Sequence, residues 1–429
     1  IGEDGFPRCF DEKAYRRMLS RKVAQPKAGR FEALQHFVTQ GFRLPEAEAM
    51  RRSCSAQLLE QIAEYHLNRD DATTAESAYS RALQIAPDIG RLHHRRGDAL
   101  LKLGRAEEAT LAFVAAANAE GAIVWSHVHA IDGLLARPNS VSDAVEHLRR
   151  SAPIWQGSPH WRAAAHRAIA GVFDLAGARA RDLYAAGRRR EADESLVACL
   201  DQVADLIRLA EPLPARLPVP ETGHIVIIAN RDLPQCEHYR VAQKVQALEH
   251  GGWSVEVFSH HDAAQGRRAI DKAAAVIFYR VAARPETLHA ILYARALGLS
   301  TIYETDDLVF DPGVYPDSLE SFEGQISVSQ HIGLQYDVPL FRYALEACDV
   351  GLASTPALAE AMRPLVRSRT CHVLRNGLDI RNLPFLTRSH TPFSKTALTL
   401  FYGSGTRAHN RDFTELAAPA LIETFKEHP

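Results

Sequence analysis

Apolar positions follow two different periodicities along the chain. Between residues 55 and 211 they recur with the three- and four-residue spacing of amphipathic helices, and after residue 224 short apolar runs alternate with helical stretches. A shift of 34 residues aligns part of the first region with itself, placing Ala63 on Gly97, Ala75 on Ala109, Tyr79 on Phe113 and Ala82 on Ala116. Small, large and small side chains at these positions let two antiparallel helices pack closely. We therefore expect a series of helical hairpins.

The 34-residue period resembles the tetratricopeptide repeat. Two units match well, and two further units, around Ala144 and around Ala192, are degenerate. The resemblance covers roughly residues 55–210 and implies a solenoid of stacked hairpins whose concave face binds a protein partner or a second copy of the chain. A helical spacer without a ligand is the alternative.

A proline-rich segment separates the two patterns. Residues 212–223 contain four prolines, which neither a helix nor a central strand accommodates, so this segment is predicted to be a linker. The chain beyond it predicts strands at 224–230, 253–259, 274–281, 300–307, 350–355 and 371–376, and helices around 237–252, 285–298, 338–349 and 356–366. Buried strands that alternate with amphipathic helices indicate a parallel sheet covered on both faces.

Ligands of such sheets bind beyond the carboxyl ends of the strands. The polar segments there are "NRDLPQCEHYR" after the first strand, Arg280 after the third, "ETDDLVFD" at the fourth and "NGLD" after the sixth. The first strand is not followed by G-x-G-x-x-G, so a dinucleotide-dependent enzyme is poorly supported.

Five segments in this order resemble glycosyltransferases with two Rossmann domains, the GT-B type, and specifically the large retaining family that uses nucleotide-sugar donors. They are "HYRVAQKVQALEHGGWSVEVFS", "YETDDLVFD", "ASTPALAEAM", "LRNGLD" and "FYGSGTRAHNRDF". The resemblance implies transfer of a sugar to a hydroxyl of a glycan, as in bacterial cell-surface polysaccharide assembly, or of a protein. A parallel with the transferases that attach N-acetylglucosamine to serine and threonine behind a repeat array is weaker. The nucleotide sugar is then a substrate, and no cofactor is expected.

The resemblance also assigns candidate site residues. The catalytic candidates are Asp306, Asp307 and His238; the donor- or phosphate-binding candidates are Gly403, Ser404, Gly405, Thr406, Arg407 and Arg240; the cleft-lining candidates are Tyr239, Arg280, Asn376 and Gly377. Two glycines ahead of a helix start suit a diphosphate, because the backbone N–H groups can approach it closely. For each residue, helix capping, turn geometry or plain solvent exposure is the structural alternative.

No metal site is expected. In single-domain glycosyltransferases, a pair of acidic residues after a strand holds a divalent ion. For Asp306 and Asp307 of this chain, the resemblance instead implies a hydrogen bond to an acceptor hydroxyl, or its polarisation. His260 and His261 have no acidic or cysteine partner at ligand spacing in the sequence.

Composition and charge restrict the remaining possibilities. A formal net charge of -2 gives no reason to expect nucleic-acid binding. The six cysteines are scattered, which favours reduced thiols and a cytoplasmic protein, with a peripheral position at the inner membrane as the alternative. No apolar run is long enough for a membrane span.

The predicted organisation has five parts: a helical extension at 1–54, repeats at 55–211, the linker at 212–223, a first Rossmann-like domain at 224–395, and the first strand and helix of a second Rossmann domain at 396–429. Since the chain starts at Ile1 and ends soon after the glycine turn, we expect a fragment that lacks about 100 to 200 residues of the second domain. The competing interpretation is a non-catalytic scaffold in which the repeats bind proteins and the Rossmann half is degenerate.

Overall fold

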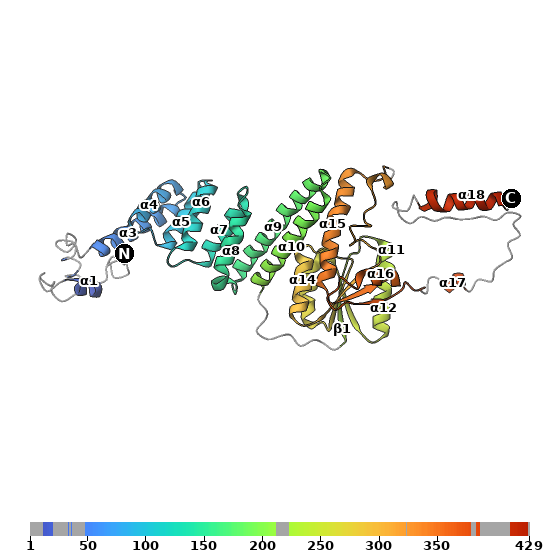
Figure 1. Cartoon of the computed structure of the whole chain (residues 1–429). Helices are drawn as coiled ribbons and strands as arrows, with labels where there is room; N and C mark the ends of the chain where they lie inside the picture. Colours follow the sequence, from blue (N-terminus) through green and yellow to red (C-terminus); the bar gives the residue numbers. More distant parts are fainter. Residues whose placement is uncertain are drawn as a thin grey trace. The chain divides into compact units, whose positions relative to one another are not determined.

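The computed structural model describes residues 12–19, 33, 36, 48–211, 223–322, 324–378, 383–386 and 412–427. It divides into two compact units, Ile1–Gly171 and Val172–Pro429. The first consists of helices and the second contains a parallel sheet with its helices (Figure 1). These features confirm the predicted class of a helical solenoid followed by a Rossmann-like domain.

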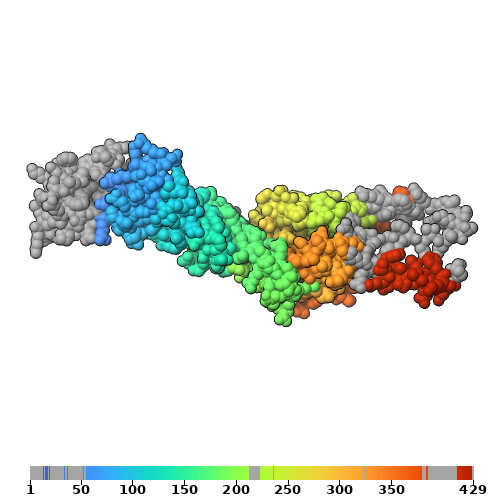
Figure 2. Space-filling model, turned by 90° about the horizontal axis from the view of Figure 1, so that it is seen from above, coloured from blue at the N-terminus to red at the C-terminus, as the bar shows by residue number. Residues whose placement is uncertain are grey.

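The first unit is a series of antiparallel helix pairs. The space-filling view shows them stacked in chain order, from blue to teal (Figure 2). After α1 (Glu12–Met18), the pairs are α3 (Glu48–Leu67) with α4 (Ala72–Ile85), α5 (Gly90–Lys102) with α6 (Ala106–Asn118), and α7 (Val124–Ala136) with α8 (Val141–Trp155). The next helix, α9 (Pro159–Ala185), contains the boundary between the two compact units. This boundary therefore lies upstream of the proline-rich segment.

The predicted small and large positions form the contacts between paired helices. Ala63 of α3 and Ala75, Tyr79 and Ala82 of α4 are fully buried in one apolar cluster. In the next pair, a Cβ atom added at Gly97 would lie 2.6 Å from the Phe113 ring. The 34-residue alignment therefore identified residues at which the two helices of a hairpin pack against each other.

The second unit contains six parallel strands in the order β2-β1-β3-β4-β5-β6. Their bounds are His224–Ala229 (β1), Ser254–Ser259 (β2), Ala275–Tyr279 (β3), Ser300–Thr305 (β4), Val350–Ala353 (β5) and Thr370–Val373 (β6), so all six predicted strands are present. Chain order reverses between β1 and β3, because β2 lies on one side of β1 and all later strands on the other. That reversal makes the carboxyl ends of β1 and β3 the topological switch point.

Helices cover both faces of this sheet (Figure 1). On one face Ile225 and Ile227 of β1 pack in a cluster with Val241 of η3 (Glu237–Ala242) and Val245 of α12 (Gln243–His250). On the other, Gly266 of α13 (Ala263–Ala269) lies against Ile228. Alternate residues of a strand point to opposite faces, so β1 is apolar from residue 225 to residue 229. Two further helices, α14 (Pro285–Ala296) and α16 (Pro356–Met362), pack against β4 and against β5 and β6, respectively.

The last repeat helix belongs to the sheet unit. Helix α10 (Arg189–Ala210) packs against both α14 and α15 (Val328–Ala347). The Tyr343 hydroxyl of α15 donates a hydrogen bond to the Asp201 carboxylate of α10 over 2.9 Å. The second unit therefore includes helices on each side of the proline-rich segment.

Two predicted elements differ from the structure or fall outside it. The helix predicted around 338–349 begins ten residues earlier, because Ser327 and Gln330 form a capping box at its start and Pro339 is accommodated inside the helix. The predicted strand and glycine turn of the second Rossmann domain, residues 398–407, lie outside the described residues. Near the end of the chain the structure describes η8 (Asp412–Ala417) and α18 (Ala418–Glu427), in which none of residues 413–427 is buried. Among the described helices, none combines the length and apolar character needed to cross a membrane.

Candidate functional site

A cavity of about 140 Å³ lies at the topological switch point of the sheet. Asn230 directly follows β1, Tyr279 ends β3 and Arg280 directly follows it, so the two paired strands at the switch point both contribute to the wall. The lining is completed by residues of the loop after β1, the segment after β4 and helix α15: Asp232, Leu233, Cys236, Val309, Tyr315, Leu334, Asp337 and Phe341. The cavity occupies the position at which parallel sheets bind ligands.

Arg280 has an unusual backbone at this position. Its φ of 48° places it in the left-handed region, which is costly for a residue with a side chain, by roughly 1 kcal/mol or more. The backbone N–H donates to the Glu304 carbonyl oxygen over 2.7 Å and so holds this conformation. Its guanidinium Nη1 contacts Asp307 at 2.7 Å and Asp306 at 3.3 Å. The strained residue therefore positions a cation at the carboxyl end of β3, against the acidic pair that follows β4.

Electrostatics keep the Arg280 cation charged. Burial acts to lower the pKa of Arg280, but the carboxylates of Asp307 and Asp306 outweigh it, so the pKa rises. Both predicted acidic residues and predicted Arg280 thus form one cluster.

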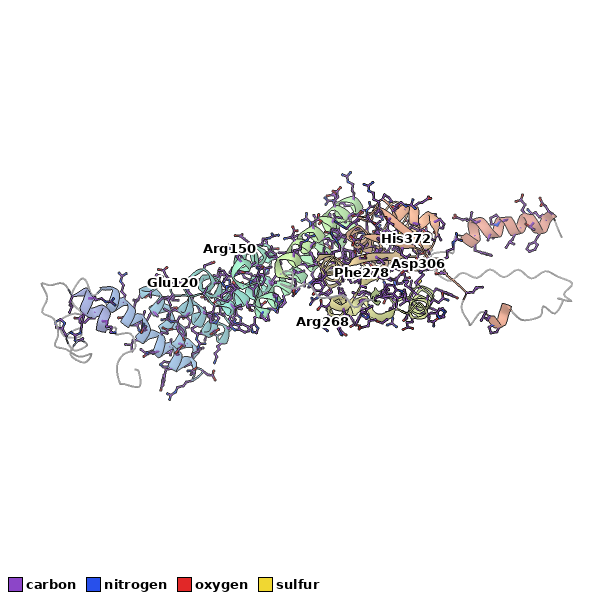
Figure 3. The ribbon with its side chains drawn as sticks, turned by 90° about the horizontal axis from the view of Figure 1, so that it is seen from below. Glu120, Arg150, Arg268, Phe278, Asp306 and His372 are labelled. Carbon is purple, nitrogen blue, oxygen red and sulfur yellow. The ribbon has the colours of Figure 1, made fainter. Side chains whose placement is uncertain are left out.

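Asp306 is held from a second side by Tyr279, whose hydroxyl donates a hydrogen bond to it over 3.1 Å. Burial and the Asp306 charge both raise the pKa of Tyr279, so the phenol keeps its proton and remains a donor. The carboxylate lies at one end of the sheet (Figure 3). The side chain of Asp306 is 16% exposed and that of Asp307 58% exposed. Asp306 is thus the fixed member of the pair and Asp307 the accessible one.

Arg240 is placed differently from a free phosphate-binding side chain. It is 1% exposed and forms an ion pair with the fully buried Glu304 of β4, with 2.6 Å between Nη2 and Oε1. Lys244, one helical turn further on, pairs with the same carboxylate. Burial lowers the pKa of Lys244, and Glu304 opposes this. Arg240 also donates from Nη1 to the Leu374 carbonyl and to Asn376 Oδ1. It therefore joins η3 to β4 and to the segment after β6.

The remaining described candidates gather around a second cavity, of about 720 Å³. Tyr239, Arg240 and Gly377 line it together with Lys244. His238 precedes Tyr239 on η3, and their rings are 4.9 Å apart between centroids. The structure thus divides the candidates between the switch-point cluster and the Arg240 region, while Gly403, Ser404, Gly405, Thr406 and Arg407 lie outside the described residues.

Several site residues escaped the sequence interpretation. Tyr279 sits inside an apolar strand, so the pattern marks it only as a buried position, and Glu304 begins the polar segment "ETDDLVFD" but was given no role of its own. Lys244 could have been identified from the sequence. It follows Arg240 by four residues, so the two cations lie on one face of a helix. Two cations that face a sheet indicate a buried anion between them. Asp337 lines the switch-point cavity from α15, where burial raises the pKa of its carboxyl and Arg284, 3.0 Å away, opposes the rise.

Comparisons with known proteins assign no family. No protein-family model matches the chain, and no curated protein matches it in sequence. Chains of solved structures do match, 36 of them. One is a mutant of the Thermobaculum terrenum O-GlcNAc transferase, with 14% identity and a TM-score of 0.23, in a match that covers 78% of this chain and 76% of that chain. Values this low describe a remote likeness and carry no argument about function.

Proposed function

We propose that this protein is a glycosyltransferase that moves a sugar from a nucleotide-sugar donor to a hydroxyl group of a glycan or of a protein. The observation that carries this proposal is the cluster of Arg280, Asp306 and Asp307 beside a cavity at the switch point of a parallel sheet. Strained backbone and mutually oriented charges at a ligand position are typical of functional sites.

The cluster suits recognition of a sugar hydroxyl. Asp306 is oriented by Tyr279 and Arg280, which leaves a carboxylate with fixed direction to accept a hydrogen bond from an acceptor and to polarise it. Asp307 offers a second, more exposed acceptor group. In this proposal the anomeric configuration is retained, the donor diphosphate is bound by the glycine turn at 403–407, and neither a metal nor a cofactor takes part.

A wider role follows from the resemblance of the sequence to polysaccharide-building enzymes. We assign the reaction to assembly of a bacterial surface polysaccharide, on the cytoplasmic side or at the inner membrane surface. The repeats would recruit the acceptor or a partner protein, or associate with a second copy.

The experiment uses the complete gene product and measures release of nucleoside diphosphate from UDP-, GDP- and dTDP-sugars, with and without a glycan or protein acceptor. We expect acceptor-stimulated release that falls roughly 100-fold in Asp306→Asn, because the amide keeps the shape but loses the charge. Arg280→Lys should reduce release by about tenfold or more, since the lysine ammonium ends one bond nearer to the backbone than Nη1, the nitrogen that contacts both carboxylates, and is more strongly hydrated.

Asp317→Asn is the matched control, because Asp317 is an exposed aspartate outside the switch-point cavity. It should retain wild-type release. Arg240→Ala is a poorer probe, since it leaves Glu304 buried with one cation fewer and is expected to destabilise the fold. Failure to bind or consume any donor, or equal activity in Asp306→Asn and Asp317→Asn, would contradict the proposal.

A second candidate function, a protein-binding scaffold, is favoured by an aromatic group in the repeats. Trp125 of α7 is 42% exposed. The centroid of its ring lies 4.4 Å from that of the His160 ring and 5.9 Å from that of the His129 ring. Exposed aromatic side chains are enriched at protein interfaces. If the protein consumes no donor but captures a partner in a Trp125-dependent way, this scaffold function takes precedence.

A further inference from the structure

Three metal-ligating side chains from two distant segments meet beside the switch point. Asp232 lies in the loop between β1 and α11 (Pro234–Cys236), and His260 and His261 begin the short helix η4 (His260–Asp262) directly after β2. Strands β1 and β2 are parallel neighbours whose last residues, Ala229 and Ser259, are paired. Both loops therefore leave the sheet at the same edge, which explains why residues 28 and 29 positions apart come together.

The separations between the three groups suit a shared cation better than direct hydrogen bonds. His260 Nε2 lies 3.8 Å from Asp232 Oδ2, and His261 Nε2 lies 3.6 Å from Asp232 Oδ1. Both distances exceed the range of a hydrogen bond. A tetrahedral ion with bonds of about 2.1 Å separates its ligand atoms by roughly 3.4 Å. The two observed distances end on different oxygens of the Asp232 carboxylate, and each is within a few tenths of an ångström of that spacing, so the carboxylate faces both imidazoles.

The two histidines are arranged as a pair. Their ring centroids are 3.9 Å apart, and one potential ligand atom from each of the three residues lies within 4.8 Å of the others. The Ser259 hydroxyl accepts a hydrogen bond from the His261 backbone N–H, which fixes the turn that brings the two rings to the same side.

The charge of the cluster also suits a metal. The Asp232 carboxylate supplies negative charge that partly neutralises a divalent ion, and an imidazole in its neutral form offers the lone pair that a metal requires.

We propose that Asp232, His260 and His261 bind one divalent transition-metal ion of the zinc type, with a fourth coordination position left for water or a ligand. Two imidazoles and one carboxylate form the donor set of zinc sites that keep an open position. Asp232 also lines the switch-point cavity, so the ion would fix the loop that forms one wall of that cavity. This binding site goes beyond the proposed sugar transfer, which does not require it.

The test is metal binding by the untagged full chain after treatment with a chelator. Zn²⁺ is titrated in competition with a chromophoric chelator, and Co²⁺ is added separately to record the visible absorption of a tetrahedral site. We expect one tight ion per chain. Loss of an outer-shell partner alone costs roughly 10- to 100-fold in affinity, so His261→Ala and Asp232→Asn should each weaken binding at least that much and abolish the cobalt bands.

The two variants and their control are all expected to keep the wild-type fold. The side chains of His261 and Asp232 are 72% and 59% exposed, so neither substitution disturbs a core, and circular dichroism should be unchanged. His250→Ala, at the exposed end of α12, is the matched control and should bind as the wild type does.

Two outcomes would overturn the site. One is no binding of either ion in the micromolar range, and the other is binding that survives in His261→Ala or Asp232→Asn, which would place the ion elsewhere. The readout contains no sugar donor, so its failure and the failure of the proposed transferase activity are separately visible.

Discussion

Two buried histidines set the pH response of the helical repeats. His127 Nδ1 and His147 Nε2 lie 3.1 Å apart between α7 and α8, and the two residues are 7% and 2% exposed. Burial lowers the pKa of both, with that of His147 falling to about 4. Because burial disfavours the charged imidazolium, the His147 ring of the folded hairpin stays neutral until the pH approaches about 4.

This pair predicts loss of stability in mild acid. Between about pH 6.5 and 4 the unfolded chain binds a proton that the folded His147 does not, so the free energy of unfolding falls as the pH is lowered through this range. The full effect of His147 is on the order of 3 kcal/mol. Urea unfolding of the helical signal at pH 7 and pH 4.5 should show it.

His147→Gln removes the titrating group and should flatten this pH dependence, even if it lowers stability at pH 7. The exposed His160→Gln should keep the wild-type slope. Equal slopes in His147→Gln and the wild type would show that other groups cause the acid sensitivity.

At the scale of elements, one close helix contact in the repeats depends on a missing side chain. Gly97 of α5 faces Phe113 of α6, and a Cβ atom there would lie 2.6 Å from the ring, well inside van der Waals distance. Alanine favours a helix over glycine by about 1 kcal/mol, but the steric conflict within a closed pair is larger.

We therefore expect Gly97→Ala to destabilise the repeats by roughly 1 to 3 kcal/mol, measured by chemical unfolding. Gly157→Ala serves as its control, because a Cβ at Gly157 meets no atom within 4 Å. A more stable Gly97→Ala variant would mean that α5 and α6 separate enough to accept the methyl group.

The sequence predicts elements more completely than sites, for a physical reason. Apolar runs such as residues 224–229 and the small residues of the hairpins carry local patterns, so the strands and paired helices can be found from neighbours in the chain. Arg280 and the Asp306–Asp307 pair were found because the strand-end rule selects them. The partners of Arg240 and of His260 come from other segments, Glu304 and Asp232, and their proximity depends on strand order that no local pattern encodes.

At the scale of the whole molecule, the proline-rich segment does not mark the edge of the sheet unit. Helix α10 precedes this segment, yet it packs on α14 and α15 and buries a long apolar face. Its buried residues are Ala192, Leu196, Cys199, Leu200, Val203, Ala204, Leu206, Ile207 and Ala210. Helix α10 is therefore part of the core of the sheet unit, where it covers α14 and α15.

This arrangement predicts different behaviour for two truncated chains. A chain that starts at residue 159 keeps α9 and α10, and its sheet unit should unfold near the temperature of that unit in the whole protein. A chain that starts at residue 223 exposes α14 and α15, and should melt roughly 10 °C lower or aggregate. Differential scanning calorimetry and size-exclusion chromatography distinguish the two, and equal melting temperatures would contradict the prediction.

The shared helix also limits how such a protein can be assembled by gene fusion. A recombination event at the proline-rich segment would join a foreign repeat array to a sheet that lacks its covering helix. An event within α9, where the compact units divide, would exchange the upstream repeats and leave α10 with the helices on which it packs. New upstream repeats are therefore most easily acquired by exchange within α9, while α10 is inherited together with the sheet.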